Sequence, residues 1–266
     1  MRVLVLLLGS LAMMGCVRKS DMPAQSVERQ SETEYDMARD FYFKGETRLA
    51  LDHIHRAIQL DSDNSKAHYF AASIHLSFCA QSFRSPDCRL GEAESFARNA
   101  MSADPDFRDA RNLLGQVLIL ENKHKEAMAV LEPLTRDMAY SANHLAWGNY
   151  GWAQVKAGLV DQGIVSLKNS VTQPRFCVGY YRLGFAYEKK NDTLLAEDAY
   201  SHALAVETPE CQNLQDAWAA RAQIRLKQGR TEEAASDFQR CALISRDTEA
   251  GRMCAHSGSS GVAIAD

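Results

Sequence analysis

Small residues recur along the chain at a spacing that is typical of paired helices. Each of six copies has one small residue and a second one twelve positions later, except the second copy, where the gap of 21 contains an insertion of nine residues. The first set is Ala38, Ala72, Gly115, Gly151, Gly184 and Ala222, and the second set is Ala50, Ala93, Ala127, Gly163, Ala196 and Ala234. Small residues let two helices approach closely, and the larger apolar residues that follow them fill the space between the helices. The pattern therefore predicts six helix pairs.

This pattern resembles the tetratricopeptide repeat, which is a helix pair of about 34 residues. The fifth copy matches best, through Tyr180, Leu183, Gly184, Tyr187, Ala196, Tyr200 and Ala203. The six repeats span residues 31–64, 65–107, 108–143, 144–176, 177–214 and 215–248. The resemblance implies an all-α fold, a right-handed α-solenoid of about six helix pairs, with a capping helix over 249–256 and a disordered tail over 257–266. An irregular α-helical domain is the alternative, which six aligned copies disfavour.

The first residues of the chain have the features of an export signal. Arg2 precedes twelve almost continuously apolar residues, Val3 to Met14, which are too few for a bilayer span of roughly 20 residues. The sequence Met13-Met14-Gly15-Cys16 then resembles the lipobox of bacterial lipoproteins. We expect a signal peptide over 1–15, a lipidated Cys16 and a flexible tether over 16–30. The resemblance implies an anchor in the outer membrane, at its periplasmic face. The alternative is an ordinary signal peptide that a cysteine follows by chance.

Six cysteines remain after Cys16, and an exported chain folds in an oxidising compartment. Among the many possible connectivities, the repeat map favours neighbours: one pair brackets the insertion, one joins adjacent repeats and one joins the last repeat to the cap. The predicted disulfides are Cys79–Cys88, Cys177–Cys211 and Cys241–Cys254. Free buried cysteines are the alternative, because Cys241 occupies a small-residue packing position.

The composition offers little for catalysis or for nucleic-acid binding. With 30 Lys and Arg against 34 Asp and Glu, the net charge of −4 gives no basic balance that would attract nucleic acid. The chain lacks the common phosphate-binding, zinc-hydrolase and nucleophile-elbow motifs, and its cysteines and histidines lack zinc-site spacing. His53, His55, His68 and His75 are interpreted as solvated or packing side chains. We expect no catalytic residue, no metal site and no cofactor, so the chain is predicted not to be an enzyme.

The first helix of each repeat is expected to line the concave face of the solenoid. Residues three before, one after and four after its small residue share one stripe and are rich in aromatic side chains. The predicted groove residues are Tyr35, Arg39, Tyr42, Tyr69, Leu76, Asn112, Gln116, Ile119, Trp152, Val155, Tyr181 and Phe185. Such a groove suits an amphipathic helix or an apolar peptide. Packing against neighbouring helices is the alternative role for Trp152 and Phe185.

The combination of lipobox, repeats and cysteines resembles the pilotin lipoproteins of type IV pili, the PilF/PilW/Tgl group. The segments 151–153, 177–184 and 211–215 and the pair Cys241 and Cys254 are most similar to the Tgl-like branch. The resemblance implies a monomeric body, and a protein that binds the pilus secretin and assists its assembly in the outer membrane. Another envelope adaptor, acting in outer-membrane protein insertion or peptidoglycan synthesis, is the alternative.

Overall fold

The computed structural model describes residues 24–81 and 86–260. Within these ranges the chain forms fourteen helices and no strand, which confirms the all-α expectation. The expected signal peptide, Cys16 and the first part of the tether lie outside the described residues, as does the tail from residue 261 onward.

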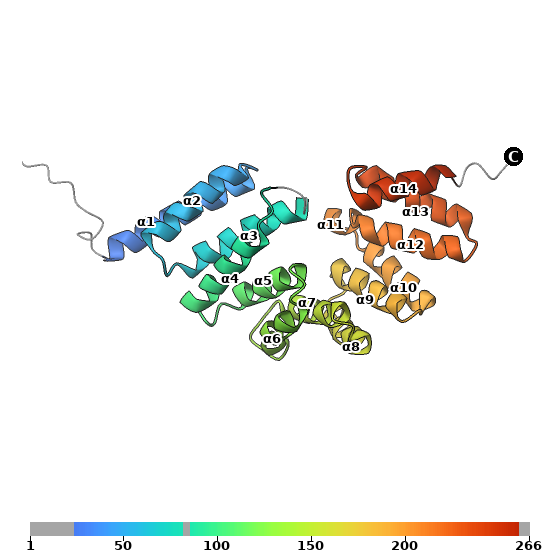
Figure 1. The fold of residues 1–266 in the computed structure, drawn as a ribbon, viewed down its shortest axis with the longest axis horizontal. Coiled ribbons are helices and arrows are strands. Elements are labelled where there is room, and N and C mark those ends of the chain that lie inside the picture. The colour runs from blue at the N-terminus through green and yellow to red at the C-terminus, as the bar shows by residue number, and fades with distance from the viewer. Residues whose placement is uncertain (1–23, 82–85, 261–266) are drawn as a thin grey trace, which may run out of the picture.

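Six helix pairs follow one another as the repeat pattern predicts (Figure 1). The pairs are α1 (Ala24–Phe43) with α2 (Thr47–Leu60), α3 (Ser65–Gln81) with α4 (Leu90–Ala103), α5 (Arg108–Leu120) with α6 (His124–Thr135), α7 (Asn143–Lys156) with α8 (Val160–Ser170), α9 (Cys177–Lys189) with α10 (Thr193–Ala205), and α12 (Gln215–Lys227) with α13 (Thr231–Ile244). The short α11 (Pro209–Gln212) precedes the last pair, and α14 (Glu249–Ser260) follows it.

The pairs stack into an arc (Figure 1). The blue α1–α2 pair and the red α13 and α14 stand at the two ends, and α7 lies on the inner side of the bend, with α6 and α8 outside it. First helices of successive repeats touch one another, since α5 contacts both α3 and α7, and α7 contacts α9. The first helices α3, α5, α7 and α9 therefore form a continuous layer along the inside of the arc.

Close approach between the two helices of a repeat explains the small residues. A Cβ atom added to Gly184 would lie 2.6 Å from Cε1 of Tyr200, and one added to Gly115 would lie 2.4 Å from Cγ of Leu131. Both large side chains are fully buried. The small residue of the first helix thus meets the large apolar residue of the second, as the sequence pattern predicts.

Sharp turns between paired helices require a left-handed residue just after the first helix. Gly45, Gly158 and Gly229 have φ values of 81°, 85° and 78°, and Asn122 and Asn191 have φ values of 61° and 60°. Glycine adopts this conformation without steric cost, and asparagine tolerates it better than most residues do. The turn after the first helix is therefore the same in five of the six pairs, the exception being the pair interrupted by residues 82–85.

Two helices extend beyond the predicted boundaries. α1 begins at Ala24, so residues 24–30 are helical rather than part of a flexible tether. The buried Ser31 donates its hydroxyl to the carbonyl of Ala57, 2.9 Å away, and accepts a bond from Asn64, which holds this part of α1 against α2 and α3. α14 runs to Ser260, so residues 257–260 belong to the cap and not to a tail.

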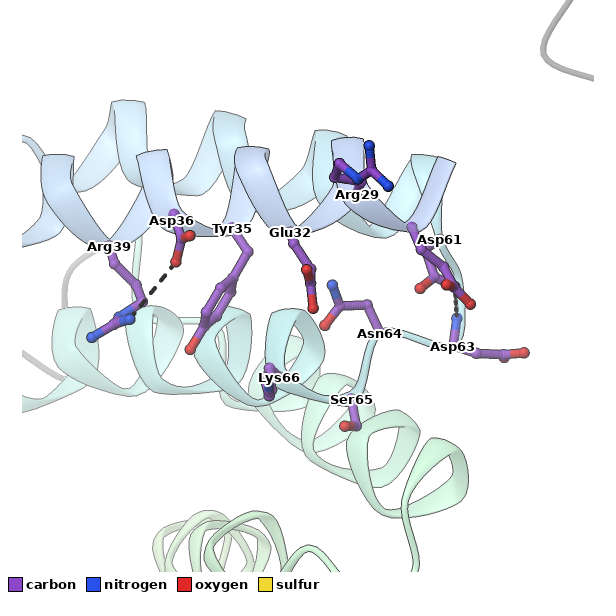
Figure 2. A pocket seen from close by; sticks show the side chains of 11 residues that line it. Arg29, Glu32, Tyr35, Asp36, Arg39, Asp61, Asp63, Asn64, Ser65 and Lys66 are labelled. Atoms are coloured by element: carbon purple, nitrogen blue, oxygen red, sulfur yellow. Dashed lines mark hydrogen bonds and ion pairs between the residues drawn. The ribbon is translucent and has the colours of Figure 1, made fainter. Parts of the chain in front are cut away.

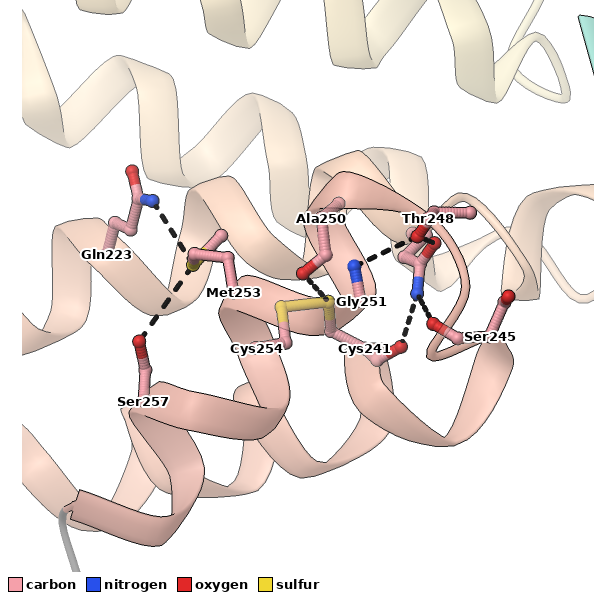
Figure 3. The surroundings of a disulfide bond; sticks show 10 residues. Gln223, Cys241, Ser245, Thr248, Ala250, Gly251, Met253, Cys254 and Ser257 are labelled. Carbon is pink, nitrogen blue, oxygen red and sulfur yellow. Dashed lines mark hydrogen bonds between the residues drawn. A yellow bond between two sulfur atoms is a disulfide. The ribbon is translucent and has the colours of Figure 1, made fainter. Parts of the chain in front are cut away.

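Three disulfides join six cysteines: Cys79–Cys88, Cys177–Cys211 and Cys241–Cys254. These are the pairs that the repeat map favours. The third fixes α14 to α13 across 13 residues of sequence (Figure 3). Beside it, Gln215 of α12 donates to the carbonyl oxygens of Cys241 and Ser245. The last repeat therefore has a covalently attached cap, and closing a loop of this length contributes about 3 kcal/mol in the chain-entropy model.

Replacing Gly151 with alanine tests the close approach. The new Cβ would lie 2.9 Å from Cγ of Leu167 and 3.0 Å from backbone atoms of α8, which a side-chain rotation cannot relieve. We expect the free energy of unfolding to fall by about 1–3 kcal/mol, measured by urea unfolding followed by circular dichroism. The matched control is Gly91→Ala in α4, where nothing lies within 4 Å of the added atom. The control is expected to be neutral or slightly stabilising, and equal stabilities of the two variants would contradict the packing argument.

Candidate functional site

The contact between paired helices decides which side of each first helix remains open. Gly151 of α7 and Gly184 of α9 face the second helices α8 and α10. A residue two positions earlier is displaced by about 200° around the helix axis, so it points almost directly away from the second helix. In α7 and α9 these residues are Asn149, which the neighbouring repeats bury to 2% exposure, and Arg182, which stays partly exposed.

Three of the predicted groove residues lie in the interior instead. Asn112, Ile119 and Val155 are only 6%, 5% and 6% exposed. Residues three before and four after the small residue lie about 60° and 40° from it around the helix, which is still close to the second helix. The prediction that these three side chains present themselves in a groove is therefore wrong.

The other predicted groove residues are at least partly exposed. At the N-terminal end, Tyr35 and Arg39 of α1 line a polar pocket of about 700 Å³ between α1 and the start of α3 (Figure 2). Arg39 forms an ion pair with Asp36 at 3.8 Å and lies over the Tyr35 ring. Five acidic and three basic side chains line this pocket: Glu28, Glu32, Asp36, Asp61, Asp63, Arg29, Arg39 and Lys66. The pocket is thus acidic and polar rather than apolar.

Tyrosines of the first two repeats pack against phenylalanines. The rings of Tyr42 and Phe70 are 5.4 Å apart, and those of Tyr69 and Phe107 are 5.0 Å apart. Burial raises the pKa of the Tyr69 hydroxyl, so it stays protonated as a hydrogen-bond donor. The half-buried Leu76 and Gln116 lie in α3 and α5. These side chains therefore pack against neighbouring helices and are only partly exposed on the surface.

A central cluster of aromatic and cationic side chains lies on α7 and α9. The Trp152 and Phe185 rings meet edge to face with centroids 5.0 Å apart, and both side chains are partly buried against the core. Three cations surround them: Arg182 and Lys156 lie over the Trp152 ring at 5.7 and 5.6 Å, and Lys189 lies over the Phe185 ring at 5.2 Å. We call these five residues the central cluster.

Beside the central cluster, a row of polar side chains crosses three repeats. Arg182 donates from Nη1 to Oδ1 of Asn149 over 2.7 Å, and Asn149 donates from Nδ2 to Oδ1 of Asn112 over 2.9 Å. Burial lowers the pKa of Arg182 to about 10, which leaves the guanidinium charged at neutral pH. The row connects α9, α7 and α5 and fixes the direction in which Arg182 points.

Asn149 and Arg182 were not among the predicted groove residues. The sequence does contain a signal for both, since each stands two positions before the small residue of its helix. Tyr181, which was predicted, is largely covered, because its ring lies 5.9 Å from that of Tyr200 in the core. The exposed part of α9 is therefore formed by Arg182 and Phe185.

The remaining candidate chemistry is structural. His68 and His75 are buried, and the His75 ring stacks on Phe96 at 5.6 Å. Burial lowers the pKa of His75, so its neutral form is favoured. In the part of the chain that the structure describes, no group of three or more His, Cys, Asp or Glu residues is arranged to hold a metal ion. No described helix combines the length and the apolar character needed to cross a membrane.

Comparisons with known proteins agree with this architecture. Residues 89–142 and 215–248 match models of the tetratricopeptide repeat family. No curated protein matches the chain significantly in sequence. The expectation of tetratricopeptide repeats in an all-α solenoid is thus confirmed, and such repeats are in general scaffolds that bind proteins.

Several solved structures have the same fold. PilW, described as a widely conserved type IV pilus biogenesis factor, is 20% identical, with 84% of this chain and 97% of PilW covered at a TM-score of 0.68. PilF of Pseudomonas aeruginosa is 13% identical, with 87% and 99% covered at a TM-score of 0.64. YrrB, a repeat protein described as having an unusual peptide-binding site, is 20% identical, with 69% and 91% covered at a TM-score of 0.51. At these identities the similarity establishes the fold.

Proposed function

We propose that this chain is an outer-membrane lipoprotein that assists assembly of the type IV pilus secretin, as a pilotin does. The observation that carries the proposal is the extent of the structural match, because 97% of PilW and 99% of PilF are covered. The chain therefore has a counterpart for nearly the whole of both repeat arrays. The lipobox-like residues that end at Cys16 support an anchor at the periplasmic face of the outer membrane.

The central cluster is the surface that we propose for the secretin segment. Trp152 and Phe185 offer exposed aromatic area held in place by their mutual contact, and such residues concentrate binding energy when a partner covers them. Trp152 belongs to α7, which lies on the inner side of the bend, and Phe185 belongs to α9, which packs beside α7 (Figure 1). An amphipathic helix that places its apolar face on these rings fits this arrangement.

Deletion of the gene tests the assembly role. Without the pilotin, we expect the heat-resistant secretin multimer to be lost from the outer membrane while the secretin monomer remains detectable. The measurement is immunoblotting of the secretin in membranes with and without prior heating. A copy of the gene supplied in trans is the control and should restore the multimer. Unchanged multimers in the deletion strain would refute the proposal and would favour another envelope adaptor.

Replacing Cys16 with alanine tests the anchor. The variant is expected to leave the outer membrane, because stable anchoring requires two or more acyl chains. Membrane fractionation and metabolic labelling with palmitate measure the two effects. A matched control is Cys88→Ala, which removes a cysteine of the repeat region and should leave labelling unchanged. Recovery of processed Cys16→Ala protein in the outer membrane at the wild-type level would contradict lipidation.

Truncation of Trp152 to alanine tests the binding surface. We expect secretin binding to weaken by roughly 2 kcal/mol or more. The truncation removes the contact of Trp152 with the partner and also the contact that holds the Phe185 ring in place. Binding of purified secretin is measured by calorimetry, and the unfolding temperature is measured on the same protein. Trp147→Ala is the control on the same helix, where the side chain lines a different hollow, with His144 and Thr172. If Trp147→Ala weakens binding as much as Trp152→Ala does, the central cluster is not the site.

A further inference from the structure

The guanidinium of Arg182 carries a charge that no described carboxylate neutralises. Its contacts are the side-chain oxygen of Asn149 and the face of Trp152. No ion pair joins it to an acidic residue anywhere in residues 24–81 and 86–260. The partly buried guanidinium loses part of its hydration, and no carboxylate in the described chain compensates for that loss, which is unfavourable for the free protein.

Other arginines at a similar depth in this chain have carboxylate partners. Arg221, whose side chain is 12% exposed, donates to Asp237 over 2.8 Å, and Arg225, which is 16% exposed, donates to both Glu197 and Asp237 over 3.0 Å. The repeat architecture therefore accommodates compensated arginines between adjacent helices. Arg182 differs from them because it lies on the side of its helix that faces away from the second helix.

The surroundings of Arg182 favour an anion. Asn149 uses its oxygen for Arg182 and its amide group for Asn112, which fixes the guanidinium and leaves its other N–H groups without an acceptor in the described chain. Lys156 and Lys189 add two positive charges beside the same two rings. Glu188 of the same helix accepts a hydrogen bond from the Tyr200 hydroxyl and forms no ion pair with Arg182. The acidic pocket between α1 and α3, by contrast, repels an anion.

We infer that Arg182 binds the side-chain carboxylate of an aspartate or glutamate in the partner segment, while Trp152 and Phe185 cover the apolar residues that flank it. The occupant is therefore an amphipathic helix with an acidic residue at the edge of its apolar face. A planar guanidinium held in a fixed orientation pairs with a carboxylate through two parallel hydrogen bonds. The inference rests on the proposed function in one respect, which is that the helix belongs to the secretin.

Synthetic helical peptides measure this preference directly. The probes share one apolar face of leucine and phenylalanine and differ at a single flanking position, which is Glu, Gln or Lys. The intact protein in detergent is expected to bind the Glu peptide roughly tenfold more tightly than the Gln peptide, and the Lys peptide least tightly. This series needs no protein variant. Equal affinity for the Glu and Gln peptides overturns the inference.

Variants of the protein assign the preference to Arg182. In Arg182→Gln the affinity for the Glu peptide should fall to that for the Gln peptide, whereas Arg240→Gln, which removes one exposed charge from α13, should keep the full preference. If Arg182→Gln disturbs the unfolding transition, Arg182→Lys replaces it and should show a reduced preference. A full preference in the folded Arg182 variant overturns the assignment.

The secretin multimer assay separates this inference from the proposed function. Loss of the multimer on gene deletion, together with equal binding of all three peptides, overturns the role of Arg182 and leaves the pilotin proposal standing. Unchanged multimers on deletion, together with a Glu preference that depends on Arg182, refute the pilotin proposal and support a carboxylate site that serves another partner.

Discussion

The close approach of the two helices within each repeat is the constraint on which the rest of this structure depends. Gly184 lies so near the ring of Tyr200 that even one additional carbon atom would collide with it, and Gly115 stands in the same relation to Leu131. This contact fixes which side of the first helix faces the second. The contact thereby also determines which side of the first helix faces away from the second helix. When the pairs stack, these outward sides of the first helices lie along the inside of the arc (Figure 1).

Because packing residues at fixed spacing encode this contact locally, the sequence was sufficient to predict the six pairs and their order. It was less informative about the exposed face. The chosen stripe lies about 40° to 100° from the small residue, so it included Asn112, Ile119 and Val155, which the second helices and neighbouring repeats cover. Trp152 and Phe185, at about 100°, lie far enough from the second helix to be partly exposed. Arg182 and Asn149 lie almost opposite the small residue and were missed; Arg182 is partly exposed, whereas Asn149 is 2% exposed and orients it from beneath.

Helix ends and additional turns depend on contacts that are distant in sequence. The first turns of α1 carry no apolar repeat, yet Ser31 bonds to Ala57 of α2 and to Asn64 ahead of α3. Likewise α14 is polar, and its position follows from the bond between Cys241 and Cys254 and from Gly251, where a Cβ would lie 1.7 Å from the carbonyl oxygen of Ser245 (Figure 3). Neither set of contacts produces a local periodicity in the sequence. A search for periodic patterns therefore does not find where α1 begins or where α14 ends.

Charge compensation separates the structural parts of the molecule from its functional part. Between α12 and α13, Asp237 is 2% exposed and is paired with two arginines. These charges compensate one another within the chain, so neither arginine needs a carboxylate from a partner. In the central cluster the opposite holds, since Arg182 is oriented by Asn149 but is left without a carboxylate in the described chain. In natural proteins, charged or polar groups that lack a compensating partner within the chain occur mainly at functional sites. A partner carboxylate would complete at Arg182 the type of pair that Asp237 already makes, which is why binding specificity is expected there and not at the better-paired arginines of the last repeat.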